Sequence, residues 1–168
     1  MEEEILSPET FAGIEPCYEF DSLTRVAEVQ LVYRPIIHPG ERPTATSQEE
    51  ATRLMRPFFE PFIYHHEEAW VMLLNNAARV LGVSRICSGG LNCTVVDVKI
   101  LFQHVIKSNA TAIILFHNHP SGNPRPSMID RQLTTRVSEA CKLLDVQFID
   151  HVIIHGDGAF SFHEEGLL

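Results

Sequence analysis

Two histidines and one aspartate stand close together in a stretch of the chain that reads IILFHNHPSGNPRPSMID. His117 and His119 end an apolar run, and residues two apart on an extended chain point to the same side. Asp130 follows a loop rich in proline, glycine, serine and asparagine, where a helix is expected to begin. Two imidazoles and one carboxylate are three ligands for a divalent metal, most simply zinc, and they leave one position open for water. The spacing therefore predicts a catalytic rather than a structural metal site.

Each of these residues also has a structural interpretation. Histidines at a strand end are often satisfied by the backbone, but two on one face that enter a loop favour a metal. The pattern Ser127-x-x-Asp130 is also a capping box, in which both side chains bind free amides at a helix start. Spacing alone leaves Asp130 open between capping and ligation. The Ser127 hydroxyl could also donate a hydrogen bond to the oxyanion of a tetrahedral intermediate.

Hydrolysis at such a metal also needs a base. A carboxylate that is not itself a ligand is the usual group that takes the proton from a metal-activated water. The candidates are Glu67 and Glu68, which open the run EEAWVMLL. On a strand these two neighbours point to opposite faces, so only one of them can reach the metal.

The pattern H-x-H, seven residues, S, two residues, D resembles the JAMM motif of the JAB/MPN metallopeptidases. The segments HNHPSGN, DHVII and EGLL resemble sequences of the RadC-like branch of that superfamily, and the resemblance covers residues 27–168. The resemblance implies that Asp130 is a ligand together with the two histidines. It also implies that Glu67 is the catalytic base, which leaves Glu68 as a solvated charge at the strand start. Ala69 stands where the family pattern has an aromatic residue.

Two residues of the segment DHVII are weaker candidates for the site. His151 is expected in the core or in support of a ligand, rather than as a ligand itself. Asp150 could orient a site histidine, although a structural role is favoured. Five other histidines have no ligand-like context: His65, His66, His104, His155 and His163.

Hydrophobic periodicity predicts the elements that position these residues. The order of the predicted strands and helices indicates an α/β fold, a mixed sheet flanked by helices. The resemblance implies the cytidine-deaminase-like layout of JAB/MPN domains. The predicted elements, in order, are a strand at 25–33, a helix at 47–59, a hairpin of strands at 67–74 and 79–88, a helix at 95–108, a buried strand at 111–116, a helix at 127–144 and a hairpin of strands at 146–155 and 159–162.

Composition limits the class of protein. With 168 residues we expect a single domain at 25–168, preceded by an acidic, flexible tail at 1–24. The net charge is −9, and seven of the 22 acidic residues precede the first basic residue, Arg25. No apolar run is long enough to span a bilayer, and the N-terminus lacks the features of a signal peptide. The four cysteines are scattered, which favours reduced thiols and a cytoplasmic location.

The resemblance implies a zinc-dependent metallohydrolase that cleaves peptide or isopeptide bonds, so a protein or peptide is the expected partner. The alternative is a RadC-like accessory protein of DNA repair or of mobile elements, with a structural or vestigial metal site. An acidic chain without the helix-hairpin-helix region common in the family argues against direct nucleic-acid binding. A nucleobase deaminase needs a PCxxC pattern that the sequence lacks. The sequence does not predict an oligomeric state.

Overall fold

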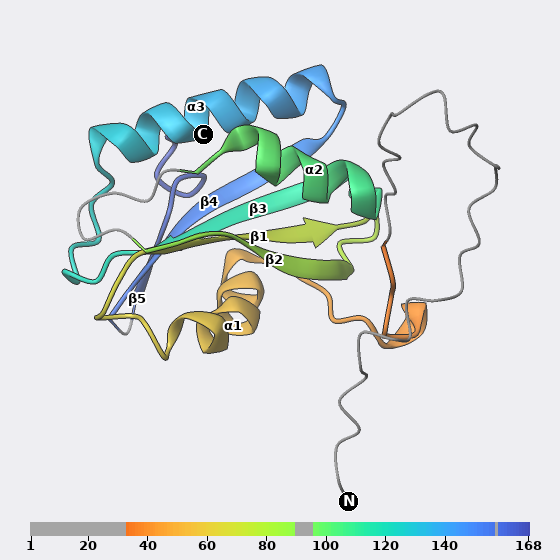
Figure 1. The fold of residues 1–168 in the computed structure, drawn as a ribbon, viewed down its shortest axis with the longest axis horizontal. Helices are drawn as coiled ribbons and strands as arrows, with labels where there is room; N and C mark the ends of the chain where they lie inside the picture. Colours follow the sequence, from red (N-terminus) through yellow and green to blue (C-terminus); the bar gives the residue numbers. More distant parts are fainter. Residues whose placement is uncertain (1–32, 90–95, 157) are drawn as a thin grey trace, which may run out of the picture. The chain divides into compact units, whose positions relative to one another are not determined.

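A mixed β-sheet forms the centre of the computed structural model, which describes residues 33–89, 96–156 and 158–168 (Figure 1). Within these residues the sheet has five strands in the order β2-β1-β3-β4-β5. Strands β3 and β4 run parallel, whereas the other neighbouring strands are antiparallel. The strands are β1 (Glu68–Leu74), β2 (Val80–Ser88), β3 (Ala112–Asn118), β4 (Gln147–His155) and β5 (Gly158–Ser161).

The helices of the described residues lie on both faces of this sheet. Helix α1 (Gln48–Phe59) covers one face, and helices α2 (Val98–Ser108) and α3 (Met128–Leu143) cover the other (Figure 1). A short 3-10 helix, η2 (Pro39–Glu41), precedes α1. The predicted α/β class, a mixed sheet flanked by helices, is confirmed.

Polar side chains set where the helices begin. The Ser47 hydroxyl accepts the backbone N–H of Glu50 at 3.2 Å and starts α1 as predicted. Helix α2 begins at Val98, later than predicted, because the Asp97 carboxylate accepts the N–H of Lys99 at 2.8 Å and caps the helix there.

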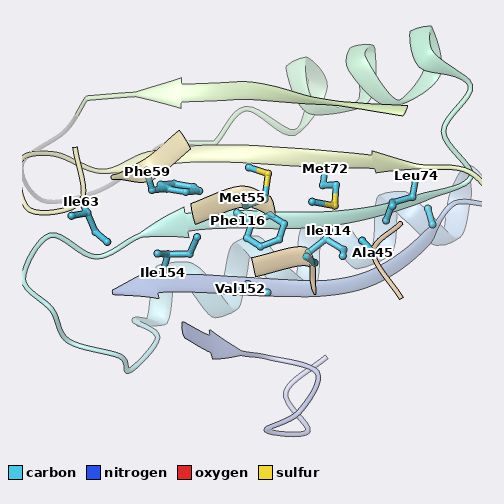
Figure 2. Close-up of a cluster of buried hydrophobic side chains, with 12 residues drawn as sticks. Ala45, Met55, Phe59, Ile63, Met72, Leu74, Ile114, Phe116, Val152 and Ile154 are labelled. Carbon is cyan, nitrogen blue, oxygen red and sulfur yellow. The ribbon is translucent and has the colours of Figure 1, made fainter. Parts of the chain in front are cut away.

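One hydrophobic core lies between α1 and the sheet. Met55 and Phe59 of α1 pack against alternate residues of the central strands, among them Met72, Phe116 and Ile154 (Figure 2). All five side chains are fully or almost fully buried. This core fixes one set of alternating residues on β1, β3 and β4, so the intervening residues must face α2 and α3.

A second core lies between the sheet and the helices α2 and α3. Leu101 of α2 and Val137 of α3 pack there with Val71 and Leu115 of the sheet. Every residue of β3 is consequently buried, which confirms the prediction of a central strand with both faces covered.

The predicted tail at 1–24 and most of the predicted strand at 25–33 lie outside the described residues. Tyr33 is described but belongs to no strand, and its hydroxyl donates to the carbonyl of Leu81 at 2.7 Å. No helix in the described residues is both long and apolar enough to cross a membrane.

Candidate metal centre

The histidines lie at the C-terminal end of β3. His117 is still part of the strand, where it is paired with Ala69 of β1 and Ile153 of β4. The backbone N–H of His119 donates to the carbonyl of Ile154 at 3.0 Å. This bond keeps the backbone extended for one residue beyond β3, so that both imidazoles lie on the face covered by α3. Asp130 approaches them from the first turn of α3.

The three predicted ligands come together at one point. Nε2 of His117 lies 3.0 Å from Nε2 of His119 and 3.2 Å from Oδ1 of Asp130, and Nε2 of His119 lies 3.6 Å from Oδ2 of Asp130. Ligand atoms of one tetrahedral zinc ion are about 3.3 Å apart. The side chains are 5%, 11% and 14% exposed, so the point is sheltered. Donor set and spacing both fit a metal ion.

The far nitrogens of both rings have partners of their own. Nδ1 of His119 lies 2.7 Å from the carbonyl of Asn123. Because a carbonyl can only accept, Nδ1 is the donor of this hydrogen bond, and Nε2 is left to face Asp130. Nδ1 of His117 lies 2.9 Å from Nε2 of His151. His151 is fully buried and supports a predicted ligand instead of joining the three, as predicted.

Asp150 does not contact the side chain of a site histidine in the described structure. Its carboxylate accepts the hydroxyl of Ser161 and the backbone N–H groups of His151 and His163. It therefore anchors the turn after β5, which is the structural role favoured from the sequence.

Asp130 caps α3, and its position beside the two histidines also suits the ligand role that its spacing left open. Its Oδ2 accepts the backbone N–H and the hydroxyl of Ser127, both at 2.6 Å, while Ser127 Oγ accepts the N–H of Asp130 at 3.2 Å. The capping box thus aims Oδ1 at His117. Because the hydroxyl proton of Ser127 is held by Asp130, an oxyanion role requires that hydroxyl to rotate, and this role stays a prediction.

The site concentrates opposite charges. Burial by itself raises the pKa of Asp130, but its close contacts with the imidazoles of His117 and His119 outweigh burial and hold the pKa well below its usual range. Burial by itself lowers the pKa of His119, yet its bonds to Asp130 and Asn123 and the charges of Asp130 and Glu67 raise that pKa. The carboxylate of Asp130 is therefore ionised at neutral pH, which suits a metal ligand.

Glu67 lies on the metal side of the sheet. It directly precedes β1 and shares a face with Ala69, the residue paired with His117. Its negative charge contributes to the raised pKa of His119, so the carboxylate lies within electrostatic reach of that predicted ligand. The position suits a base that does not bind the metal itself, and the catalytic role stays a prediction.

The prediction that Glu68 is a solvated charge was wrong. Glu68 is fully buried, and its carboxylate accepts the indole N–H of Trp70 at 2.9 Å and the hydroxyl of Ser88 at 2.8 Å. Arg85 at 3.3 Å and His66 at 3.2 Å complete its surroundings. Burial raises the pKa of Glu68, but these partners lower it further than burial raises it. The sequence contained a signal for this burial, because Glu68 lies two residues before Trp70 on the strand and so shares its face of the sheet.

Sequence reasoning missed Thr134. Its hydroxyl lies 2.7 Å from the backbone carbonyl of Asp130 and 2.7 Å from Nδ1 of His151. A threonine four residues after Asp130 on a helix commonly donates to that carbonyl, and this spacing was the available signal.

Comparison with known proteins identifies relatives across the whole site. The family model of the RadC-like JAB domain matches residues 45–167. A UPF0758 protein of Porphyromonas gingivalis is 39% identical over 161 residues, which cover 95% of this chain and 69% of that protein. A UPF0758 protein of Desulforudis audaxviator is 41% identical over 164 residues, with coverage of 93% and 70%. A UPF0758 protein of Flavobacterium johnsoniae is 39% identical over 122 residues, with coverage of 73% and 52%.

The chain thus spans between about half and seven-tenths of the length of these relatives, whose names state no activity. The matched range contains both predicted catalytic residues and all three predicted ligands. Its mixed sheet with helices on both faces agrees with a JAB-domain fold. The chain therefore belongs to the RadC-like JAB-domain family.

Proposed function

We propose that this chain is a zinc-dependent hydrolase of the JAMM type, which cleaves amide bonds in peptide or isopeptide linkage. The observation that carries the proposal is the convergence of His117, His119 and Asp130 within one ligand sphere. Glu67 on the same face supports it, because metal-assisted hydrolysis needs a carboxylate that is not a ligand.

Nε2 of His117, Nε2 of His119 and one oxygen of Asp130 would hold the ion. When bound, zinc supplies the Lewis acidity that activates a water and polarises the scissile carbonyl. Glu67 takes the proton of the attacking water and delivers it to the leaving amine. The N-terminus of α3 provides partial positive charge beside the developing oxyanion, and Ser127 donates to that oxygen after its hydroxyl turns away from Asp130.

A protein or peptide substrate and a cytoplasmic location are part of this proposal. The competing function is an accessory role in DNA repair or mobile elements, in which the same three residues bind a structural metal or none. The two differ in whether the metal is needed for bond cleavage, and one set of measurements separates them.

The test compares the wild-type chain with His119→Ala. Elemental analysis is expected to find about one equivalent of zinc in the wild type and none in the variant. A pool of synthetic peptides and lysine-linked isopeptides, followed by mass spectrometry, is expected to show cleavage that a chelator stops and added zinc restores. Absence of zinc from the wild type contradicts the proposal. Zinc without cleavage, together with salt-dependent DNA binding that His119→Ala leaves unchanged, favours the accessory role.

A further inference from the structure

A closed circuit of polar contacts begins and ends at Asp130. Its carboxylate contacts Nε2 of His117 at 3.2 Å, and Nδ1 of His117 contacts Nε2 of His151 at 2.9 Å. Nδ1 of His151 contacts the hydroxyl of Thr134 at 2.7 Å, and this hydroxyl contacts the backbone carbonyl of Asp130 at 2.7 Å. The circuit links β3, β4 and α3, the three elements that meet at the site.

The chemistry of the partners fixes the direction of this circuit. Two oxygens 2.7 Å apart need a proton between them, and the Asp130 carbonyl can only accept, so Thr134 donates to it. The single hydroxyl proton is then used, and Thr134 must accept from Nδ1–H of His151. Nε2 of His151 is left as an acceptor and receives Nδ1–H of His117.

The reverse direction makes as many hydrogen bonds, because Nε2–H of His117 would then donate to the Asp130 carboxylate, but it leaves the 2.7 Å contact rather than the 3.2 Å contact without a proton. If Thr134 donated to His151, then His151 would donate to Nδ1 of His117, and the Asp130 carbonyl would face an oxygen lone pair at 2.7 Å. Both His151 and Thr134 are buried, so a missing hydrogen bond there has no water to replace it. The direction that starts with Thr134 donating to Asp130 is therefore the more stable one.

We propose that Thr134 and His151 are positioning residues, which fix the proton of His117 on Nδ1 and so keep its Nε2 lone pair directed at the metal. The effect on metal binding rests on the proposed function, whereas the tautomer itself is a property of the metal-free chain. A metal ligand that must first move its proton binds more weakly than one already in the right tautomer.

The surroundings of His151 suit this role. Its ring stacks on Phe162, with centroids 4.6 Å apart and an angle of 16° between the planes. The ring is fully buried and contacts Thr134 through Nδ1 and His117 through Nε2, so it is held in one orientation. A ring held in one orientation is required of an acceptor that selects a tautomer.

The test uses Thr134→Val, which preserves shape but removes the hydroxyl, and Thr134→Ser, which retains the hydroxyl. Nitrogen-15 NMR of the metal-free wild type, at a pH where the rings are neutral, is expected to show the proton on Nδ1 of both His117 and His151. In Thr134→Val the Nδ1–H of His151 loses its acceptor, and both rings are expected to shift toward the Nε2–H form. Thr134→Ser is expected to keep the wild-type tautomers.

Competition titrations with zinc give a second readout. Thr134→Val is expected to bind zinc about 10–100-fold more weakly than the wild type, while Thr134→Ser stays within about threefold. A wild-type His151 protonated on Nε2, or a Thr134→Val chain that binds zinc as tightly as Thr134→Ser, overturns the proposal. If the wild type binds no zinc, the proposed function fails, and the tautomers of the metal-free chain still decide whether the positioning relay exists.

Discussion

The side-chain oxygen of Asn118 accepts a hydrogen bond from the backbone N–H of Glu68 at 2.7 Å. Asn118 stands between the two site histidines in sequence but points to the opposite face, as expected for the middle residue of an extended triplet. The regular pairing of β1 with β3 ends at Ala69 and His117. The Asn118 side chain thus extends the pairing of β1 with β3 by one residue. It thereby holds the backbone of Glu67 beside the backbone of the two histidines.

Replacing Asn118 tests this connection. The side-chain amide of Asn118 also donates to the carbonyls of Ile63 and His66, at 3.3 and 2.9 Å. Asn118→Ala leaves these buried groups and the N–H of Glu68 without partners, so a loss of about 1–3 kcal/mol in unfolding free energy is expected. Hydrolysis should fall more than zinc content, since Glu67 is displaced while the ligands remain.

Urea unfolding, zinc analysis and peptide cleavage measure the three effects of Asn118→Ala. Asn76→Ala, in an exposed turn, is the matched control and should change stability by less than about 0.5 kcal/mol. Equal stability of Asn118→Ala and the wild type would show that water or another group replaces the Asn118 bonds.

Glu67→Gln separates the base from the ligands. The amide keeps the size of the side chain but cannot take a proton, so zinc content should stay at the wild-type value. The rate of hydrolysis should drop about 10²–10⁴-fold. Glu164→Gln, at an exposed carboxylate, is the control and should retain full activity. Wild-type turnover by Glu67→Gln would assign the proton transfer to another group.

The local sequence predicted the two histidine ligands because their arrangement depends on short-range geometry. Residues two apart on a strand share a face, and a serine three residues before an aspartate forms a helix cap. His117 and His119 needed only the first rule, whereas the second fits Asp130 equally well as a helix cap, and its choice as a ligand came from the resemblance to the JAMM motif. The partners of Glu68 depend instead on the register of β2 against β1, which pairs Trp70 with Arg85. No pattern within either strand specifies that register.

The boundaries of β3 illustrate the same limit. The apolar run predicted a strand that ends at Phe116, but the strand continues through His117 and Asn118. His117 pairs with both β1 and β4, and Asn118 pairs with β4, so the sheet accommodates these two polar residues. Thr134 was missed for a similar reason, since its partner His151 comes from a strand that follows α3 and approaches it only in the folded chain.

The two roles of Asp130 can be separated by a pair of substitutions. Ser127→Ala removes the cap hydroxyl and should cost about 1 kcal/mol of stability while zinc remains bound. Asp130→Asn keeps an acceptor for the N–H of Ser127 but loses the ligand charge, so zinc affinity should fall while the helix start is preserved. Circular dichroism, thermal unfolding and zinc titration distinguish these outcomes.

Ser127→Ala also tests the oxyanion role of the hydroxyl. If Ser127 donates to the oxyanion, the zinc-loaded variant should hydrolyse peptides about 10²–10³-fold more slowly. A zinc-loaded Ser127→Ala chain with wild-type turnover would show that Ser127 only caps the helix and does not donate to the oxyanion.

Glu68 should make the stability of the chain sensitive to acid. Because its partners hold the folded-state pKa below the unfolded value, ionised Glu68 stabilises the fold above the unfolded pKa of about 4.3. That contribution is lost as the pH falls through the folded-state pKa. Glu68→Gln cannot ionise, and at neutral pH it should lose about 1–3 kcal/mol because Ser88 and Trp70 donate to a weaker acceptor.

Urea unfolding of the wild type and Glu68→Gln across a pH series measures this dependence. The gap between the two proteins should be constant near neutral pH and should narrow in acid, below about pH 4. Glu60→Gln removes one exposed carboxylate and controls for the loss of a negative charge. Two stability curves that run parallel into acid would mean that Glu68 has the same pKa in the folded and unfolded chains, and that its four partners position the side chain without favouring its charge.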